Sequence, residues 1–171
     1  NSDYDVYMGI DFAMGKQRGD YSAIVTLARH RRIGTIYVID AWGDPVHPDE
    51  FMKIIVQKVM QYQPERIAAE AQQAQEWFVD KLKEALQYEG YPAYTRVEAV
   101  KHRQRKQLRI EAMLPDIEAG KIQFNRNHRL LLEQFEIYPQ GHDDLPDAMQ
   151  MAYAIAKERK SAVIQKPDWL Y

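Results

Sequence analysis

The sequence lacks cysteine: none of its 171 residues is one. Disulfides, thiolate nucleophiles and zinc sites built on cysteine are therefore excluded. The chain also lacks any apolar run near the roughly 20 residues that a membrane-spanning helix needs, and it shows no signal peptide. We expect a soluble protein of a reducing compartment with no membrane partner.

The chain also has no strong excess of one charge, because it contains 23 Lys and Arg and 25 Asp and Glu. Any nucleic-acid partner must therefore be sought in where the charges lie. The phosphate loop Gly-x-x-x-x-Gly-Lys-Ser/Thr is also missing, since MGKQRG at residues 14–19 lacks its spacing. This excludes a nucleotide-driven motor of that class from this chain.

What is present is ordinary for a globular domain, with 46% hydrophobic and 28% charged residues. We expect one domain over residues 1–160 and a tail over 161–171. Apolar runs rich in β-branched and aromatic residues predict strands over 6–12, 21–29 and 33–42. Only three residues separate the second run from the third, which predicts a hairpin and an antiparallel start to the sheet.

Helical and strand patterns alternate after residue 47. Strands are expected over 66–70 and 94–100, with an irregular one near 121–124, and helices over 48–61, 73–88, 104–118 (interrupted at Pro115), 130–137 and 144–159. This order predicts an α/β fold with a mixed five-stranded sheet, in which three antiparallel strands precede parallel ones and helices cover both faces.

Four carboxylates occupy distinctive places in this pattern. Asp11 ends the first strand, Glu70 ends the fourth, and Asp144 and Asp147 open the last helix. Sites in open α/β sheets form beyond the carboxyl ends of the strands, so these acids are expected to meet there. Converging carboxylates repel one another unless a cation lies between them, and oxygen ligands suit Mg²⁺ or Mn²⁺. Two such ions would catalyse phosphodiester hydrolysis.

Structural roles are open alternatives for the same acids. Asp11 can start a turn, and Glu70 can complement the dipole of the next helix. Asp144 is a good N-cap, with Asp147 in the place of the second capping-box residue. The residues four and seven positions after Asp147 are Met151 and Ala154, and a helix that is apolar nearly all round is buried. A buried carboxylate needs a partner, so Asp147 is expected to ligate a metal, whereas Asp144 can both cap and ligate.

The motifs GIDFA, GDYSAI, IAAE, KHRQRKQLR, LPDIEAGKIQF and GHDDLPDAM follow one another from about Tyr7 to Ala156. In this order they resemble the nuclease domain of the large terminase subunit of tailed bacteriophages, a ribonuclease H-like domain similar to Holliday-junction resolvases. The resemblance implies an endonuclease that cuts concatemeric viral DNA during genome packaging, using two divalent cations, Mg²⁺ or Mn²⁺. It also implies an N-terminal ATPase motor, a portal and a small terminase subunit as partners, and action in the host-cell cytoplasm.

Carried over residue by residue, the resemblance makes Asp11, Glu70 and Asp147 catalytic. These three and Asp144 would hold the metals, and the supporting residues would be Asp20, His142 and Asp143. Because no motor motif is present, the chain is expected to be an isolated C-terminal domain, monomeric by itself.

Basic residues supply the expected DNA surface, since Lys and Arg bind the phosphate backbone. Those expected to contact double-stranded DNA are Lys16, Arg18, Lys101, Arg103, Arg105, Lys106 and Arg109, with Arg31 and Arg32 completing a positive rim. A solvated helix face is the alternative for the same residues. No base-reading motif is visible, so little sequence preference is expected.

Three other functions compete with a terminase nuclease. A resolvase or another ribonuclease H-like nuclease would share the acids, but a resolvase requires a dimer. An actin-like nucleotide-binding fold would need a second glycine-rich loop and a longer, duplicated chain, and neither is present. A purely structural DNA-binding module remains if the acids only cap.

Overall fold

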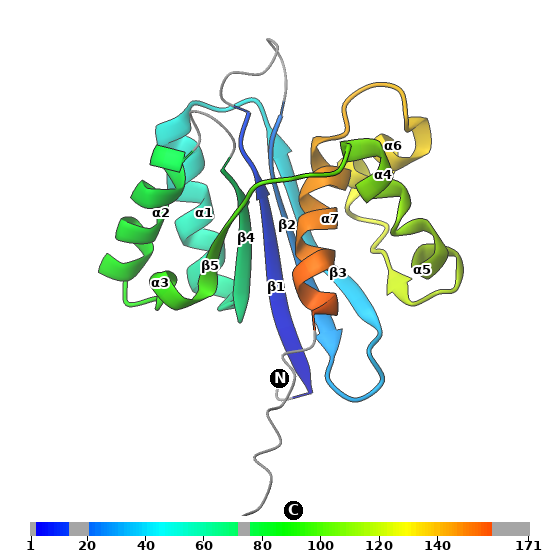
Figure 1. Cartoon of the computed structure of the whole chain (residues 1–171), viewed down its shortest axis with the longest axis horizontal. Helices are drawn as coiled ribbons and strands as arrows, with labels where there is room; N and C mark the ends of the chain where they lie inside the picture. Colours follow the sequence, from blue (N-terminus) through cyan, green and yellow to red (C-terminus); the bar gives the residue numbers. More distant parts are fainter. Residues whose placement is uncertain (1–2, 14–20, 72–75, 159–171) are drawn as a thin grey trace, which may run out of the picture.

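The structure, a computed structural model, describes residues 3–13, 21–71 and 76–158. The predicted tail at 161–171 and the first residues of the predicted second helix lie outside these ranges. A central sheet separates two groups of helices (Figure 1). Its strands are β1 (Tyr4–Asp11), β2 (Ser22–His30), β3 (Ile36–Asp44), β4 (Arg66–Glu70), β5 (Val97–Val100) and β6 (Ile122–Gln123).

The helices are α1 (Pro48–Tyr62), α2 (Glu76–Tyr88), α3 (Ala93–Arg96), α4 (Lys106–Glu111), α5 (Leu114–Glu118), α6 (Arg129–Ile137) and α7 (Asp144–Lys157). One group, α1 to α3, covers one face of the sheet, while α4 to α7 lie on the other (Figure 1). No helix in the described ranges is long and apolar enough to cross a membrane.

The strand order is β5-β4-β1-β2-β3-β6. β1, β2 and β3 pair antiparallel, whereas β4 and β5 run parallel to β1. The α/β class and the mixed sheet are thus confirmed, but the predicted number of strands is wrong. The sheet has six, because the two residues of β6 pair parallel with the start of β3.

Two predicted elements differ in detail because of proline. The expected strand at 94–100 is a strand only from Val97, because α3 begins directly after Pro92. The predicted helix at 104–118 is two helices. Pro115 has no N–H group to donate to a preceding turn, so α5 starts anew at Leu114, in the first turn where proline is tolerated.

Side chains of β1 alternate between two apolar cores, as the pleat of a strand requires. Met8 and Ile10, with Phe12 directly after the strand, pack in the core shared with α1 and α2. Tyr7 packs in the core shared with α7. Gly9 and Asp11 therefore face α7 as well, since they follow Tyr7 at intervals of two.

Gly9 sets how closely α7 approaches the sheet. A Cβ atom on Gly9 would lie 1.9 Å from the carbonyl oxygen of Ala148, a residue of α7. Gly43 plays a similar part at β3, where a Cβ would lie 2.5 Å from Cδ1 of Leu145. Backbone-to-backbone packing at Gly9 thus brings the first turns of α7 to the end of β1.

We predict that Gly9→Ala destabilises the fold by more than about 1–3 kcal/mol, the usual cost of overpacking a core, because a backbone carbonyl cannot rotate away as a side chain does. Gly90→Ala is the matched control. Gly90 has a φ of +91° and no atom within 4 Å of its Cβ position, so it reports backbone strain alone. Urea unfolding measures both. Equal losses in the two variants would contradict the close approach of α7.

Candidate metal centre

The register of the parallel pair β1–β4 brings two of the predicted acids together. Gly9 pairs with Ala68 and Ile10 with Ala69, so the next residues, Asp11 and Glu70, lie side by side. Both lie at the carboxyl ends of their strands. Asp11 is fully buried, and Glu70 is partly buried.

Asp147, in the first turn of α7, completes a group of three carboxylates. One oxygen from each of Asp11, Glu70 and Asp147 lies within 4.8 Å of the other two. Asp147 has no exposed surface. Oδ2 of Asp147 and Oε2 of Glu70 are buried and accept no hydrogen bond from the described residues. Three close, buried carboxylates suit a hard divalent cation, which would satisfy these oxygens and offset their charge. Their role as ligands stays a prediction.

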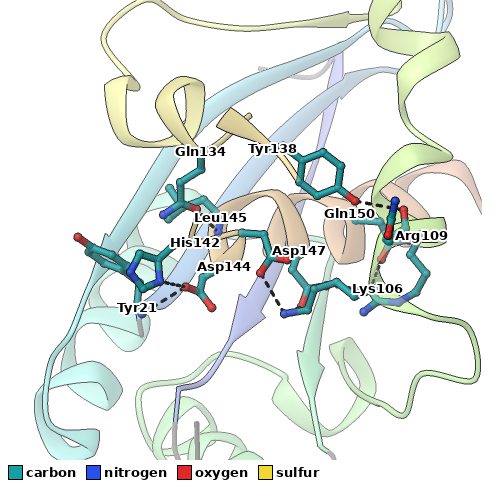
Figure 2. A network of polar contacts seen from close by, with 12 residues as sticks. Tyr21, Lys106, Arg109, Gln134, Tyr138, His142, Asp144, Leu145, Asp147 and Gln150 are labelled. Carbon is teal, nitrogen blue, oxygen red and sulfur yellow. Dashed lines mark hydrogen bonds and ion pairs between the residues drawn. The ribbon is translucent and has the colours of Figure 1, made fainter. Parts of the chain in front are cut away.

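Asp144 lies one turn earlier in α7 and is buried, but it is not a member of this three-residue group. Its Oδ2 accepts a hydrogen bond from the backbone N–H of Tyr21 at 3.3 Å and lies 3.8 Å from Nδ1 of His142. The rings of Tyr21 and His142 meet edge to face, with centroids 5.1 Å apart. Figure 2 shows this cluster beside Asp147. Asp144 thus stays a predicted ligand, with His142 beside it.

The capping role predicted for Asp144 is wrong. α7 begins at Asp144 with Asp143 as its N-cap residue, and no side-chain hydrogen bond comes from the cap. Gln134 of α6 takes that part instead, because its Oε1 accepts a hydrogen bond from the N–H of Leu145 at 2.9 Å. The carboxylate of Asp144 instead accepts a hydrogen bond from the backbone N–H of Tyr21.

Only one of the two apolar residues that were predicted to cover Asp147 is buried: Met151 is buried, whereas Ala154 is exposed. Asp147 contacts Arg109 of α4 and lies beside Asp11 of β1.

Arg109 was expected at the DNA surface, and that placement is wrong. Only 7% of Arg109 is exposed, and its Nη1 lies 2.8 Å from Oδ1 of Asp147 and 2.8 Å from Oε1 of Gln150. The buried carboxylate draws the guanidinium inward, because an unpaired charge in that place would be costly.

Lys106 lies one turn earlier in α4 and is partly exposed. Its Nζ lies 3.2 Å from Oδ1 of Asp143 and 3.5 Å from Oδ2 of Asp147. Burial lowers the pKa of Lys106, but the carboxylates of Asp147, Asp11 and Asp143 outweigh it and raise that pKa overall. Lys106 therefore stays an ammonium ion beside the acids.

His102 is a residue of this site that the sequence argument missed. It follows Val100, the pairing partner of Glu70, by two positions. Burial and the cation of Arg109 lower the pKa of His102, against the opposing effect of Asp147 and Glu70, so the neutral imidazole is favoured. Strand alternation after Val100 is the signal in the sequence that places His102 on the side of the acids.

The remaining basic residues fall into three groups. Lys101, Arg103 and Arg105 are exposed on the segment that joins β5 to α4, and Lys101 pairs with Glu76. Arg31 and Arg32 lie in the turn after β2, whose His30 pairs with Tyr4, so the predicted rim is wrong for these two. They lie at the end of the sheet opposite Asp11. The predicted residues Lys16, Arg18 and Asp20 lie outside the described residues.

We predict opposite stability effects of removing charge from Glu70 and from Asp147. Without metal, Glu70→Gln should melt no lower than the parent, because it removes repulsion and exchanges a carboxylate oxygen that accepts no hydrogen bond. Asp147→Asn should lose roughly 3–5 kcal/mol, because Arg109 is left buried without its counter-charge. Both variants should lose the rise in melting temperature that Mn²⁺ gives the parent. An undiminished rise in both would contradict a metal centre.

Known proteins resemble this chain in sequence family and in fold. Residues 8–155 match the family described as the terminase RNaseH-like domain. The human cytomegalovirus terminase nuclease domain, soaked with Mn, superposes with a TM-score of 0.67 at 15% identity, covering 92% of this chain and 86% of that one. The large terminase nuclease of the thermophilic phage G20c, with bound zinc, gives 0.64 at 18% identity and covers 90% and 82%.

The Holliday junction resolvase of fowlpox virus is also similar, with a TM-score of 0.57 at 12% identity over 88% of this chain and 96% of that one. No curated protein matches the chain in sequence. The structural likenesses establish the ribonuclease H-like fold, and the family match covers most of the chain. The chain therefore belongs to the terminase RNaseH-like domain family.

Proposed function

We propose that this domain is a metal-dependent DNA endonuclease that cleaves concatemeric viral DNA during genome packaging, with little sequence preference. The observation that carries the proposal is the group formed by Asp11, Glu70 and Asp147, whose oxygens approach within 4.8 Å at the carboxyl edge of a terminase-type sheet. Without a cation the three carboxylates repel one another, and their oxygens are the ligands that a hard divalent cation prefers.

Asp11, Glu70 and Asp147 would hold one divalent cation, and Asp144 would help to hold a second. Bound cations of this kind activate water and stabilise the leaving oxygen of a phosphodiester. Mg²⁺ or Mn²⁺ is proposed, and the Mn and zinc present in relatives support a divalent ion.

The protein's own side chains would prepare the site for substrate. Lys106 combines a retained positive charge with partial exposure, so its ammonium can bind a phosphate oxygen at the edge of the acid group. His102, held neutral, can accept a proton from water. Asp143 holds the ammonium of Lys106, and His142 lies beside Asp144.

Double-stranded DNA would lie across the exposed cations Lys101, Arg103 and Arg105, which share the edge of the sheet with the acids. Lys16 and Arg18 are proposed to join them. In a complete terminase the domain would work with an ATPase motor, a portal and a small subunit in the host-cell cytoplasm. By itself it is proposed to be a monomer over residues 1–160.

A resolvase is the second candidate, favoured by the fowlpox structure, nearly all of which this chain covers. Light scattering separates the two, because a four-way junction with two cleavage points calls for a dimer. A dimer that cuts junctions in preference to linear duplex would replace the packaging role with resolution.

The catalytic prediction concerns supercoiled plasmid in Mg²⁺ or Mn²⁺. The parent should nick and linearise it, and Asp11→Asn, Glu70→Gln and Asp147→Asn should each lose activity by at least about 100-fold, since each removes a ligand. Asp116→Asn is the matched control. Asp116 accepts hydrogen bonds from Tyr153 and Lys157 of α7 but is not part of the acid group. Cleavage at the parental rate by any of the first three would remove that residue from the site.

The DNA-surface prediction concerns the triple variant Lys101→Gln, Arg103→Gln and Arg105→Gln. Loss of three phosphate contacts should raise KM with little change in kcat and flatten the dependence of log affinity on log salt by up to about 2.7. Arg31→Gln with Arg32→Gln, at the opposite end of the sheet, should leave both unchanged. The same salt slope in parent and triple variant would contradict DNA binding along this segment.

A further inference from the structure

Arg109 contacts the buried carboxylate of Asp147 in a way that treats its two oxygens differently. Nη1 of Arg109 lies 2.8 Å from Oδ1, a short, charge-assisted hydrogen bond. Oδ2 accepts no hydrogen bond from the described residues, and the ammonium of Lys106 lies 3.5 Å from it. Oδ1 of Asp147 is thus held by Arg109, whereas Oδ2 remains available to a ligand of the acid group.

The two cations also differ in how firmly they are held. The side chain of Arg109 is 8% exposed and that of Lys106 is 35% exposed. Lys106 can leave toward solvent, where an ammonium is well hydrated, while the guanidinium of Arg109 cannot do so without opening the core. A cation entering the acid group would therefore displace Lys106 and leave Arg109 in place.

Gln150 fixes the orientation of the guanidinium. It lies three residues after Asp147, so both side chains lie on the same side of α7, and its Oε1 accepts from the same Nη1 at 2.8 Å. Figure 2 shows Arg109 together with Gln150 next to Asp147. Ile110 and Met113, which follow Arg109, are buried in the core that α7 shares, so the backbone that carries Arg109 is anchored.

We propose that Arg109 is a positioning residue for the metal centre: with Gln150 it holds Oδ1 of Asp147 and so directs Oδ2 to a divalent cation. This inference rests on the proposed metal site. A metal ligand whose second atom is fixed by a neighbour loses less freedom on binding, and replacing such neighbours costs about 10- to 100-fold in metal affinity or activity.

A purely structural role would be to neutralise Asp147 in the core. A control arginine that is buried away from the acids distinguishes this structural role from the positioning role. Arg66 is likewise a poorly exposed arginine on the α7 side of the sheet, paired with Glu98 at 2.6 Å and Glu158 at 2.9 Å and bonded to the carbonyl of Ile155. Arg66→Met should therefore lose stability as Arg109→Met does, at a distance from the acids.

The test is calorimetric titration of the folded domain with Mn²⁺, alongside plasmid cleavage at saturating Mn²⁺. Arg109→Met should bind Mn²⁺ at least about tenfold more weakly, and its kcat should fall while KM for DNA is unchanged. Arg109→Lys should recover part of the affinity, because it keeps the charge without the fixed fork. Arg66→Met should bind Mn²⁺ as the parent does. Parental Mn²⁺ affinity in Arg109→Met would overturn the proposal.

Where Arg109→Met does not fold, Gln150→Leu decides, since it retains both charges and removes only the second acceptor of Arg109. Weaker Mn²⁺ binding supports the positioning role, and parental binding overturns it. The titration does not need nuclease activity. If the parent binds Mn²⁺ and fails to cleave DNA, the proposed function falls while the role of Arg109 is still measured.

Discussion

Helix α7 lies against β1 at a separation that only glycine permits, and the acid group exists because of that contact. The carbonyl oxygen of Ala148 occupies the space that a Cβ on Gly9 would need. Asp147 directly precedes Ala148, and Asp11 follows Gly9 by two on the same face of the strand. The packing of backbone on backbone therefore brings a carboxylate of the last helix to a carboxylate of the first strand, about 136 residues apart in sequence.

The same contact brings negative charges together in the protein interior, and two cations of α4 compensate them. Asp11 and Asp147 are buried away from water. Burying a carboxylate costs free energy unless a partner compensates its charge. Two cations of α4 supply this compensation: Arg109 from within the core and Lys106 from its edge. The guanidinium of Arg109 is buried together with Asp147, whereas the ammonium of Lys106 is partly exposed.

Much of this was accessible from the sequence, because it follows from local rules. Asp11 and Glu70 end strands, parallel strands share a carboxyl edge, and a helix opening with acids before an apolar run has to place Asp147 near the interior. The burial of Arg109 does not follow from the sequence, because it depends on how α4 packs against α7, a contact across 38 residues that no local pattern encodes. The place of Arg31 and Arg32 does not follow from the sequence either, because composition gives the charge of a turn and not the end of the sheet at which the turn lies. The cap from Gln134 likewise depends on tertiary contacts, as does the pairing of β3 with the strand predicted near 121–124.

The most direct measurement is a crystal structure of the domain soaked in Mn²⁺, with the ion located by anomalous scattering. We predict a Mn²⁺ bound by Asp11, Glu70 and Oδ2 of Asp147, with Lys106 displaced and Arg109 still on Oδ1. An anomalous peak bound by other side chains, with these three carboxylates unliganded at saturating Mn²⁺, would contradict the account.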